Sequence, residues 1–299
     1  MRVCASPRLT AIEGGALQPV RSDRRLGHVL AARGQIDADG ITRVLEHQQT
    51  HHVRFGEAAI QLGLITLDDL VDAITAQYGL PHLQPGDHRF SLELVTAFDP
   101  CHPCAEQIRA VRSQLIQHWP EPERGQPLML AIVSPAHGDG RSYLAANLAV
   151  SLAQLGRRTL LIDADLRWPR QHHIFGVLDR QGLATVLGGR ADRSAVMALP
   201  PFGPLHLLCA GGCPPNPLDL LARDTWPALL RVLKREFDAI VVDTPPLANC
   251  SDGLGVAQQT GHALIVARQN ATRLQGTLDL VNQLRADGVC VMGSVLNAA

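Results

Sequence analysis

The chain has 299 residues, of which 46% are hydrophobic and 18% are charged, the balance of a globular protein with a substantial core. A formal net charge of −1 argues against a nucleic-acid-binding protein, because neutralising phosphates requires a surplus of Lys and Arg. No apolar run approaches the roughly 18–20 residues that span a bilayer, and the N-terminal segment lacks the apolar centre of a secretory signal. We therefore expect a cytoplasmic protein without a nucleic-acid partner.

Composition divides the chain into four parts. Residues 1–22 show no hydrophobic periodicity, which predicts a disordered tail. Residues 23–80 hold a tandem repeat with helical patterning, and residues 81–105 are rich in Pro and Gly, as expected of a linker. In residues 106–299, strand-like and helix-like segments alternate, which predicts a separate, larger domain.

The repeat consists of two 24-residue segments, 25–48 and 54–77, offset by 29 residues. The two copies share Arg, Gly, Gly, Ile, Asp and Gln at matched positions. Each copy predicts a short helix, a turn at Gly34 or Gly63 and a second helix, because glycine tolerates the positive φ that follows a helix end. Two such hairpins packed together predict a small helical domain.

Six continuous apolar runs predict buried strands, at 128–134, 159–163, 205–209, 239–243, 263–267 and 289–295. Helical runs lie between some of them, near 142–155, 217–236 and 272–286. Buried strands that alternate with helices are typical of a parallel sheet covered on both faces. The predicted fold class is therefore α/β, with a central, mostly parallel sheet flanked by helices.

The stretch SPAHGDGRSYLAANLA follows the first of these strands and enters a helix, which is the context of a phosphate-binding loop. Gly138 and Gly140 allow backbone N–H groups to turn inward, and Ser142 supplies the hydroxyl that such loops offer to Mg²⁺. The GxxxxGK[ST] pattern is broken twice: a proline replaces the first glycine, and Arg141 replaces the lysine. Arginine keeps the positive charge but changes the geometry around a phosphate.

Two acidic elements end later strands: LLIDADLRWPR, with Asp163, Asp165 and Arg167, and AIVVDTPP, with Asp243. The carboxyl ends of neighbouring parallel strands converge on the crevice where such sheets bind ligands. Together with Ser142, these carboxylates are expected to hold Mg²⁺, and one of them to accept a proton from an attacking hydroxyl. Any one aspartate at a strand end equally fits a helix cap.

These motifs together resemble the bacterial tyrosine kinases (BY-kinases), part of the wider class of MinD- and ParA-like P-loop ATPases. A further motif, Glu106-x-x-Arg109-x-x-Arg112, resembles the ExxRxxR self-association element of these kinases and lies along one side of a predicted helix. The same motif equally fits a solvated helix face. The resemblance covers roughly residues 95–299.

The resemblance implies an ATP- and Mg²⁺-dependent protein-tyrosine kinase that regulates exopolysaccharide chain length or export. It implies a homo-oligomer. It also implies a membrane-embedded polysaccharide chain-length determinant as the partner that recruits the chain to the inner face of the plasma membrane.

The predicted site residues fall into four groups. The catalytic group consists of Arg141, Asp163, Asp165 and Asp243. The nucleotide-binding group consists of Gly138, Asp139, Gly140, Arg141, Ser142, Tyr143, Arg167 and Asn297. The metal ligands are Ser142, Asp163 and Asp243, and the oligomerisation group is Glu106, Arg109 and Arg112. Asn297 is carried over from a strand of the wider class whose asparagine approaches the adenine.

One feature departs from the BY-kinases, which generally phosphorylate a tyrosine cluster in a C-terminal tail. This sequence holds only Tyr78 and Tyr143. A non-catalytic, nucleotide-binding assembly switch of the same export system is therefore an alternative, favoured by the missing cluster and opposed by the carboxylates. A MinD/ParA-type ATPase is a third hypothesis, disfavoured because Ala136 stands where that branch usually has a second lysine.

The N-terminal repeat resembles the N-terminal domain of type II secretion ATPases, whose tandem RLGxx…Q motifs bind cyclic di-GMP. The residues that carry this resemblance are Arg25, Gly27, Gln48, Arg54, Gly56 and Gln77. Arginines can contact guanine edges or phosphates with two hydrogen bonds, and the glycines allow close approach. The alternative is a helical docking module in which the same positions only cap and pack.

Overall fold

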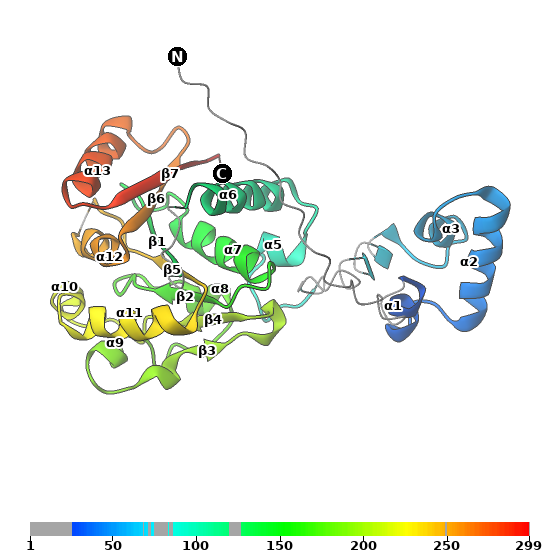
Figure 1. Cartoon of the computed structure of the whole chain (residues 1–299), viewed down its shortest axis with the longest axis horizontal. Coiled ribbons are helices and arrows are strands. Elements are labelled where there is room, and N and C mark those ends of the chain that lie inside the picture. Colours follow the sequence, from blue (N-terminus) through cyan, green and yellow to red (C-terminus); the bar gives the residue numbers. More distant parts are fainter. Residues whose placement is uncertain are drawn as a thin grey trace, which may run out of the picture. The chain divides into compact units, whose positions relative to one another are not determined.

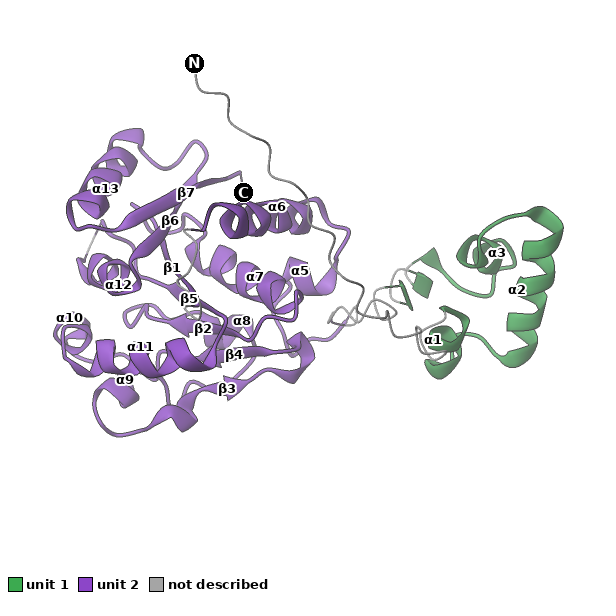
Figure 2. Ribbon diagram, viewed as in Figure 1, with its two compact units in different colours: residues 1–80 green, residues 81–299 purple. Residues whose placement is uncertain are grey.

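The computed structural model describes residues 26–67, 69–70, 73–74, 83, 86–119, 127–248 and 250–298. The chain forms two compact units, residues 1–80 and 81–299 (Figure 2). Among the described residues, no helix has the length and apolar character needed to cross a membrane. The predicted tail, residues 1–22, lies outside the described residues.

The N-terminal unit contains the helices α1 (Leu26–Ala32), α2 (Ala38–His51) and α3 (Phe55–Gln61). Glycines follow α1 and α3 with φ of 71° at Gly34 and 66° at Gly63, the left-handed conformation that the repeat predicted. The apolar faces of the helices form one small core, which includes Leu30, Ile36, Val44, Ala58, Ala59, Ile65 and Ala73.

The larger unit is built on one seven-stranded sheet with the strand order β3-β4-β2-β5-β1-β6-β7 (Figure 1). Its strands are β1 (Leu128–Val133), β2 (Thr159–Asp163), β3 (Met197–Ala198), β4 (Leu205–Leu208), β5 (Ala239–Asp243), β6 (His262–Arg268) and β7 (Cys290–Asn297). All pairings are parallel except that of β3 with β4. The predicted α/β fold is confirmed, and the two-residue edge strand β3 is the strand that the sequence did not predict.

Helices cover both faces of the sheet. They are α5 (Val95–Phe98), α6 (Pro103–His118), α7 (Arg141–Ala153), α8 (Gln171–Ile174), α9 (Leu183–Leu187), α10 (Pro217–Leu221), α11 (Thr225–Glu236), α12 (Asp252–Thr260) and α13 (Leu274–Ala286). The 3₁₀ turns η2 (Arg193–Ala195) and η3 (Pro200–Phe202) flank β3. This arrangement explains why the central strands are apolar without interruption.

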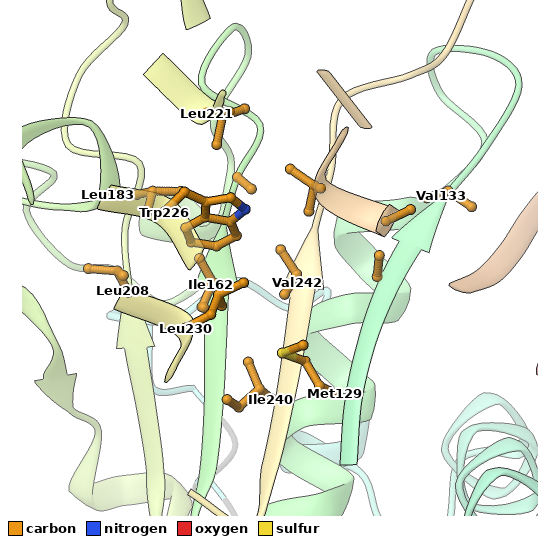
Figure 3. Close-up of a cluster of buried hydrophobic side chains, with 14 of the residues drawn as sticks. Met129, Val133, Ile162, Leu183, Leu208, Leu221, Trp226, Leu230, Ile240 and Val242 are labelled. Carbon is orange, nitrogen blue, oxygen red and sulfur yellow. The ribbon is translucent and has the colours of Figure 1, made fainter. Parts of the chain in front are cut away.

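The strand side chains alternate between two cores. Met129 and Ile240 belong to the core beneath α11, in which Trp226 is fully buried (Figure 3). Leu130 and Ile132, on the opposite face, belong to the core that contains the α7 side chains. Both faces of the sheet are therefore closed, and the polar chemistry is confined to the strand ends.

The predicted linker, residues 81–105, is not a linker in the structure. Its described residues belong to the larger unit, where Leu94 and Ala97 are fully buried. The Thr96 hydroxyl donates to Oδ1 of Asn147 at 2.9 Å, which ties α5 to α7. Pro and Gly content indicated an irregular backbone correctly, but it does not distinguish a free linker from an irregular segment that packs.

Candidate functional site

The phosphate loop connects β1 to α7. Gly138 and Gly140 have φ of 81° and 100°, a conformation that side chains other than glycine rarely adopt. The Asp139 carboxylate closes the loop from inside, because its Oδ2 accepts the Ala136 N–H at 2.8 Å. Helix α7 begins at Arg141, so its positive end faces the loop. This is the backbone geometry of an anion site.

The Arg141 guanidinium is buried and holds the loop together. Its Nε donates to the Thr244 carbonyl oxygen, and its Nη1 donates to the Ala136 carbonyl oxygen, both at 2.8 Å. Nη1 also donates to the Ser134 hydroxyl. Arginine thus joins the end of β1, the loop and the segment after β5, a set of contacts that the single ammonium of lysine cannot make.

Two carboxylates lie side by side at the carboxyl ends of β2 and β5. Asp163 and Asp243 are paired residues in the register of these strands, and neither is accessible to solvent. Burial raises the pKa of the Asp163 carboxyl well above its ordinary value, and the neighbouring Asp243 charge raises it further. Burial also raises the pKa of Asp243, to about 6, against the opposing effect of hydrogen bonding and of the Arg141 charge.

Gln171 connects the two carboxylates, and the sequence analysis missed it. Its backbone N–H donates to Asp163 Oδ2 at 3.0 Å, and its side-chain amide donates to Asp243 Oδ2 at 2.7 Å. The same amide reaches the Ser142 carbonyl oxygen at 3.1 Å. No strand, glycine or charge pattern singles out this glutamine, since α8 has only four residues. Gln171 fixes the orientation of both acids.

The geometry fits a bound magnesium ion. Asp243 Oδ1 is buried and has no hydrogen-bond partner within the described part of the chain. A cation beside Asp163 and Asp243 would satisfy this oxygen and relieve the repulsion between the two charges. The described residues include no cluster of three or more His, Cys, Asp or Glu side chains suited to a metal. The predicted set of Ser142, Asp163 and Asp243 therefore requires phosphate or water oxygens to complete it.

Asp165 lies two residues beyond Asp163, at the end of β2, and only 3% of its surface is exposed. Its Oδ1 accepts the backbone N–H groups of Arg167 at 3.2 Å and Trp168 at 2.9 Å. Arg167, predicted as a nucleotide-binding residue, forms an ion pair in which its Nε lies 2.7 Å from Asp252 Oδ2 on α12. The sequence shows no sign of this partner, which lies 85 residues away.

The remaining predicted nucleotide residues border the loop. The Asn297 amide donates to the Asp139 carbonyl oxygen at 3.2 Å, and a Cβ at Gly140 would collide with that amide nitrogen. Thr272 adds a contact that the sequence did not suggest, because its hydroxyl donates to Asp139 Oδ1 at 2.6 Å. Tyr143 is half-buried, and burial raises the pKa of its phenol to about 12. The structure thus brings Asn297 to the loop, where it contacts Asp139, a residue 158 positions earlier in the sequence.

The three residues of the predicted self-association motif lie on α6 and make contacts within this chain. Arg109 pairs with Glu106, Nη2 to Oε2 at 2.6 Å, and also donates to the Pro100 carbonyl oxygen at 2.6 Å. Arg112 Nη1 donates to the Ser151 carbonyl oxygen on α7 at 2.7 Å. Of the three, Glu106 presents the most accessible charge, with 72% of its side chain exposed.

In the N-terminal unit, two of the predicted cyclic di-GMP residues have a packing role. A Cβ at Gly27 would lie 3.2 Å from the Phe55 ring, and one at Gly56 would lie 2.5 Å from Leu70. Gln48 is half-buried, and Arg54 is exposed at the start of α3. The other two predicted residues, Arg25 and Gln77, lie outside the described residues.

Comparison with known sequences finds relatives of one kind, which are named as tyrosine-protein kinases. No protein-family model matches the chain. The tyrosine-protein kinase ptk of Acinetobacter johnsonii is 34% identical over 169 residues, 56% of this chain and 23% of the relative. The putative tyrosine-protein kinase CapB of Staphylococcus aureus is 32% identical over 193 residues, 64% of this chain and 83% of the relative. This chain therefore spans about a quarter of the Acinetobacter relative and most of the Staphylococcus one.

Solved structures agree with the sequence relatives. The kinase domain of the Escherichia coli tyrosine kinase ETK matches with a TM-score of 0.66 and 29% identity, covering 73% of this chain and 84% of that one. The septum site-determining protein MinD of Pyrococcus horikoshii, solved with Mg-ADP, matches with a TM-score of 0.51 and 25% identity, over 57% of this chain and 70% of its own. The α/β unit thus shares its fold with kinases and with a P-loop ATPase.

Proposed function

Because this chain belongs to the family of bacterial tyrosine-protein kinases, we propose that it transfers the γ-phosphoryl group of ATP to a tyrosine hydroxyl. The observation that carries the proposal is the pair of buried carboxylates, Asp163 and Asp243, next to a loop built for phosphate. A protein without a cationic ligand would gain nothing from burying two acids side by side. A nucleotide with its magnesium ion is the ligand that matches both features.

The roles of the side chains follow from their positions. The N–H groups of the loop and the N-terminus of α7 bind phosphate oxygens, with Arg141 holding the loop in shape and adding charge. Ser142, Asp163 and Asp243 would hold magnesium, which when bound draws charge from the phosphate oxygens as a Lewis acid.

The chemical step is an in-line displacement. The phenolic oxygen of the acceptor forms a bond to the γ-phosphorus, and the bond from that phosphorus to the bridging oxygen breaks, so that ADP leaves with the electron pair. The phenolic proton passes to Asp165, whose Oδ1 is fixed by two backbone N–H groups and which lies two residues beyond Asp163.

The wider role is an extension of the same proposal. The chain acts in exopolysaccharide export, at the inner face of the plasma membrane, on a membrane-embedded chain-length determinant. It works as a homo-oligomer, in which the exposed Glu106 carboxylate contacts a neighbouring copy. Arg109 and Arg112 support that contact indirectly, because Arg109 binds Pro100 just before α6 and Arg112 ties α6 to α7.

The test is phosphotransfer from γ-labelled ATP to the cytoplasmic segment of the cognate determinant. The proposal requires phosphotyrosine on that segment. Nucleotide-dependent assembly without transfer would support the non-catalytic switch instead. Release of free phosphate without phosphotyrosine would support an ATPase of the MinD/ParA type.

For the N-terminal unit we propose cyclic di-GMP binding that gates the kinase. The support is the duplicated 24-residue pattern and the exposed Arg54 at the start of α3. Gly27 and Gly56 give no further support, since packing explains them. Calorimetry of the full chain with cyclic di-GMP tests the proposal, and the matched variant is Arg54→Ala. Binding that the variant does not weaken, or no binding at all, would contradict it.

A further inference from the structure

An exposed aromatic pair stands beside the phosphate loop and has no role in the proposal above. Trp168 follows the acidic element of β2, and 47% of its surface is exposed. His137 is an exposed residue of the phosphate loop itself. The two ring centroids are 6.0 Å apart and the planes are inclined at 82°, an edge-to-face pair. The pair therefore joins the two loops that border the catalytic crevice.

The position of Trp168 is fixed relative to the proposed proton acceptor. Its backbone N–H donates to Asp165 Oδ1 at 2.9 Å. Trp168 therefore helps to orient the Asp165 carboxylate and also bears the exposed indole. The ring is not part of either core, whereas Trp226 is fully buried in one of them. An indole that exposes about half its surface leaves a large apolar area in water, which aromatic ligands are well suited to cover.

We infer that His137 and Trp168 form the subsite that receives the aromatic ring of the acceptor tyrosine. The inference rests on the proposed kinase activity and names a part of its acceptor site. A phenol ring packed on the indole gains an offset or edge-to-face contact, next to the segment that holds Asp165. Serine and threonine lack a ring and gain no such contact, so the subsite selects tyrosine.

The adenine base is the other flat ring expected at this site, but the family resemblance assigns it to a different residue, Asn297. Asn297, the residue that the family resemblance assigns to adenine, donates to the Asp139 carbonyl oxygen at 3.2 Å. Thr272 reaches Asp139 as well, so both polar side chains lie against one residue of the loop. The aromatic pair includes neither Asn297 nor Thr272, and the backbone N–H of Trp168 donates to Asp165.

Two sources can supply the acceptor tyrosine: another protein, or a second copy of this chain. The chemistry at the subsite is the same for both. Tyr143 is unsuitable because its phenol is half-buried on α7. A copy of this chain would therefore have to present Tyr78. The Tyr78→Phe variant distinguishes the sources, since it abolishes labelling of the chain itself but leaves labelling of an added peptide unchanged.

The experiment uses the full chain saturated with ADP and Mg²⁺ and a fluorescent peptide with a single tyrosine among glycines. Its twins carry phenylalanine or leucine in place of the tyrosine. Fluorescence anisotropy is expected to give similar affinities for the tyrosine and phenylalanine peptides and a weaker one for the leucine peptide. In Trp168→Leu, affinity for the tyrosine peptide falls roughly fivefold, and Trp168→Phe keeps most of it. His137→Ala gives a smaller loss in the same direction.

Leu155→Ala is the matched control, because this exposed leucine lies beyond the opposite end of α7 from the loop. Leu155→Ala should leave the affinity for all three peptides unchanged. The affinity for ADP should also be the same in Trp168→Leu as in the wild type. Equal binding of the leucine peptide, unchanged tyrosine-peptide affinity in Trp168→Leu, or a matching loss of ADP affinity would overturn the inference.

The kinetic arm separates the subsite from the kinase proposal itself. With labelled ATP, Trp168→Leu should raise KM for the tyrosine peptide roughly fivefold and leave kcat within about twofold. If the wild type binds the peptide through Trp168 but transfers no phosphate to it or to any tyrosine, the kinase proposal fails, and His137 and Trp168 remain a binding site for an aromatic side chain but not an acceptor subsite. If transfer occurs with an unchanged KM in Trp168→Leu, the kinase proposal stands and the subsite fails.

Discussion

Glycine occurs at marked positions in both units of the chain, but the structure uses it for different purposes. Gly27 and Gly56 lie inside helices of the N-terminal unit, where a Cβ would press against Phe55 or Leu70. Gly138 and Gly140 lie between a strand and a helix of the larger unit and have positive φ. A glycine pattern in the sequence is therefore ambiguous until the backbone conformation and the neighbouring atoms are known.

Buried charge distinguishes the two units more sharply. Among the described residues, the N-terminal unit buries apolar side chains and no charged one. The larger unit buries Asp163 and Asp243 as neighbours and leaves Asp243 Oδ1 without a partner. Packing alone gives no reason for such a pair, because uncompensated buried charge opposes folding. The difference teaches that this pair, more than any glycine, marks the functional unit.

The largest expected effect comes from Asp163→Asn. It removes a proposed magnesium ligand, so phosphotransfer should fall by about 10³-fold or more. It also removes one of two repelling buried charges, so the melting temperature of the ligand-free protein should rise. Labelled ATP and thermal unfolding measure the two effects. Asp287→Asn, at an exposed residue after α13, is the control. Retained activity, or lost activity with lower stability, would contradict the account.

Arg141→Lys tests whether the arginine is needed in this loop. Lysine restores the common motif but cannot bind the Thr244, Ala136 and Ser134 oxygens together. We expect affinity for ADP with Mg²⁺ to fall by about tenfold, together with a lower melting temperature. Calorimetry measures the affinity. An unchanged or tighter affinity would mean that Arg141 only stands in for lysine.

The pH dependence of stability tests the buried pair in the ligand-free protein. The pKa of Asp243 is raised from 3.8 to about 6, so the unfolded chain loses this proton at lower pH than the folded one. The stability contributed by protonated Asp243 is fully present below pH about 4 and is lost as the pH rises through about 6. Relative to Asp243→Asn, the free energy of unfolding should therefore fall by about 2–3 kcal/mol over this window.

Denaturant unfolding of both proteins at a series of pH values measures this difference. The N-terminal unit supplies the internal reference, since it buries no charged side chain among its described residues. A difference that stays constant from pH 4 to pH 7, or that grows with pH, would show that the two carboxylates are not held as described.

Gly56→Ala should give the smallest effect, confined to the N-terminal unit. The new methyl group would meet Leu70 at 2.5 Å, and the resulting overpacking costs about 1–3 kcal/mol. Hydrogen exchange of residues 26–67 should increase, while ADP affinity and phosphotransfer in the absence of cyclic di-GMP stay unchanged. Gly255→Ala, where the added Cβ meets nothing within 4 Å, is the control. Equal effects of both substitutions would show that Gly56 does not serve packing.

The sequence predicted the strands well because each is a continuous apolar run bounded by turns. All six predicted strands formed, β2 and β5 with the predicted ends and the other four with ends shifted by one or two residues. Strand β3 was not predicted because its two residues are too few to show a pattern. Helix α5 was not predicted because the Pro and Gly residues around it suggested a linker. Periodicity therefore located the core but not the short elements that depend on tertiary contacts.

The candidate site was predictable only where a motif follows a strand. The phosphate loop, Asp163 and Asp243 obey that rule, since strand order alone brings strand ends together. Gln171 and Thr272 do not, because their roles arise from side chains that meet across the fold. The nucleotide-binding role of Arg167 stays a prediction, and the structure adds its ion pair with Asp252, a partner that the sequence does not indicate. A single sequence identifies charges but not their partners.

Calorimetry of the full chain with ADP, in Mg²⁺ and in EDTA, tests the central claim most directly. If the loop and the paired acids form one site for a nucleotide and its metal, Mg²⁺ should tighten ADP binding by at least about tenfold in the wild type. In Asp163→Asn that tightening should disappear while binding in EDTA remains. Equal affinity with and without Mg²⁺ in the wild type, or a full magnesium effect in the variant, would contradict the claim.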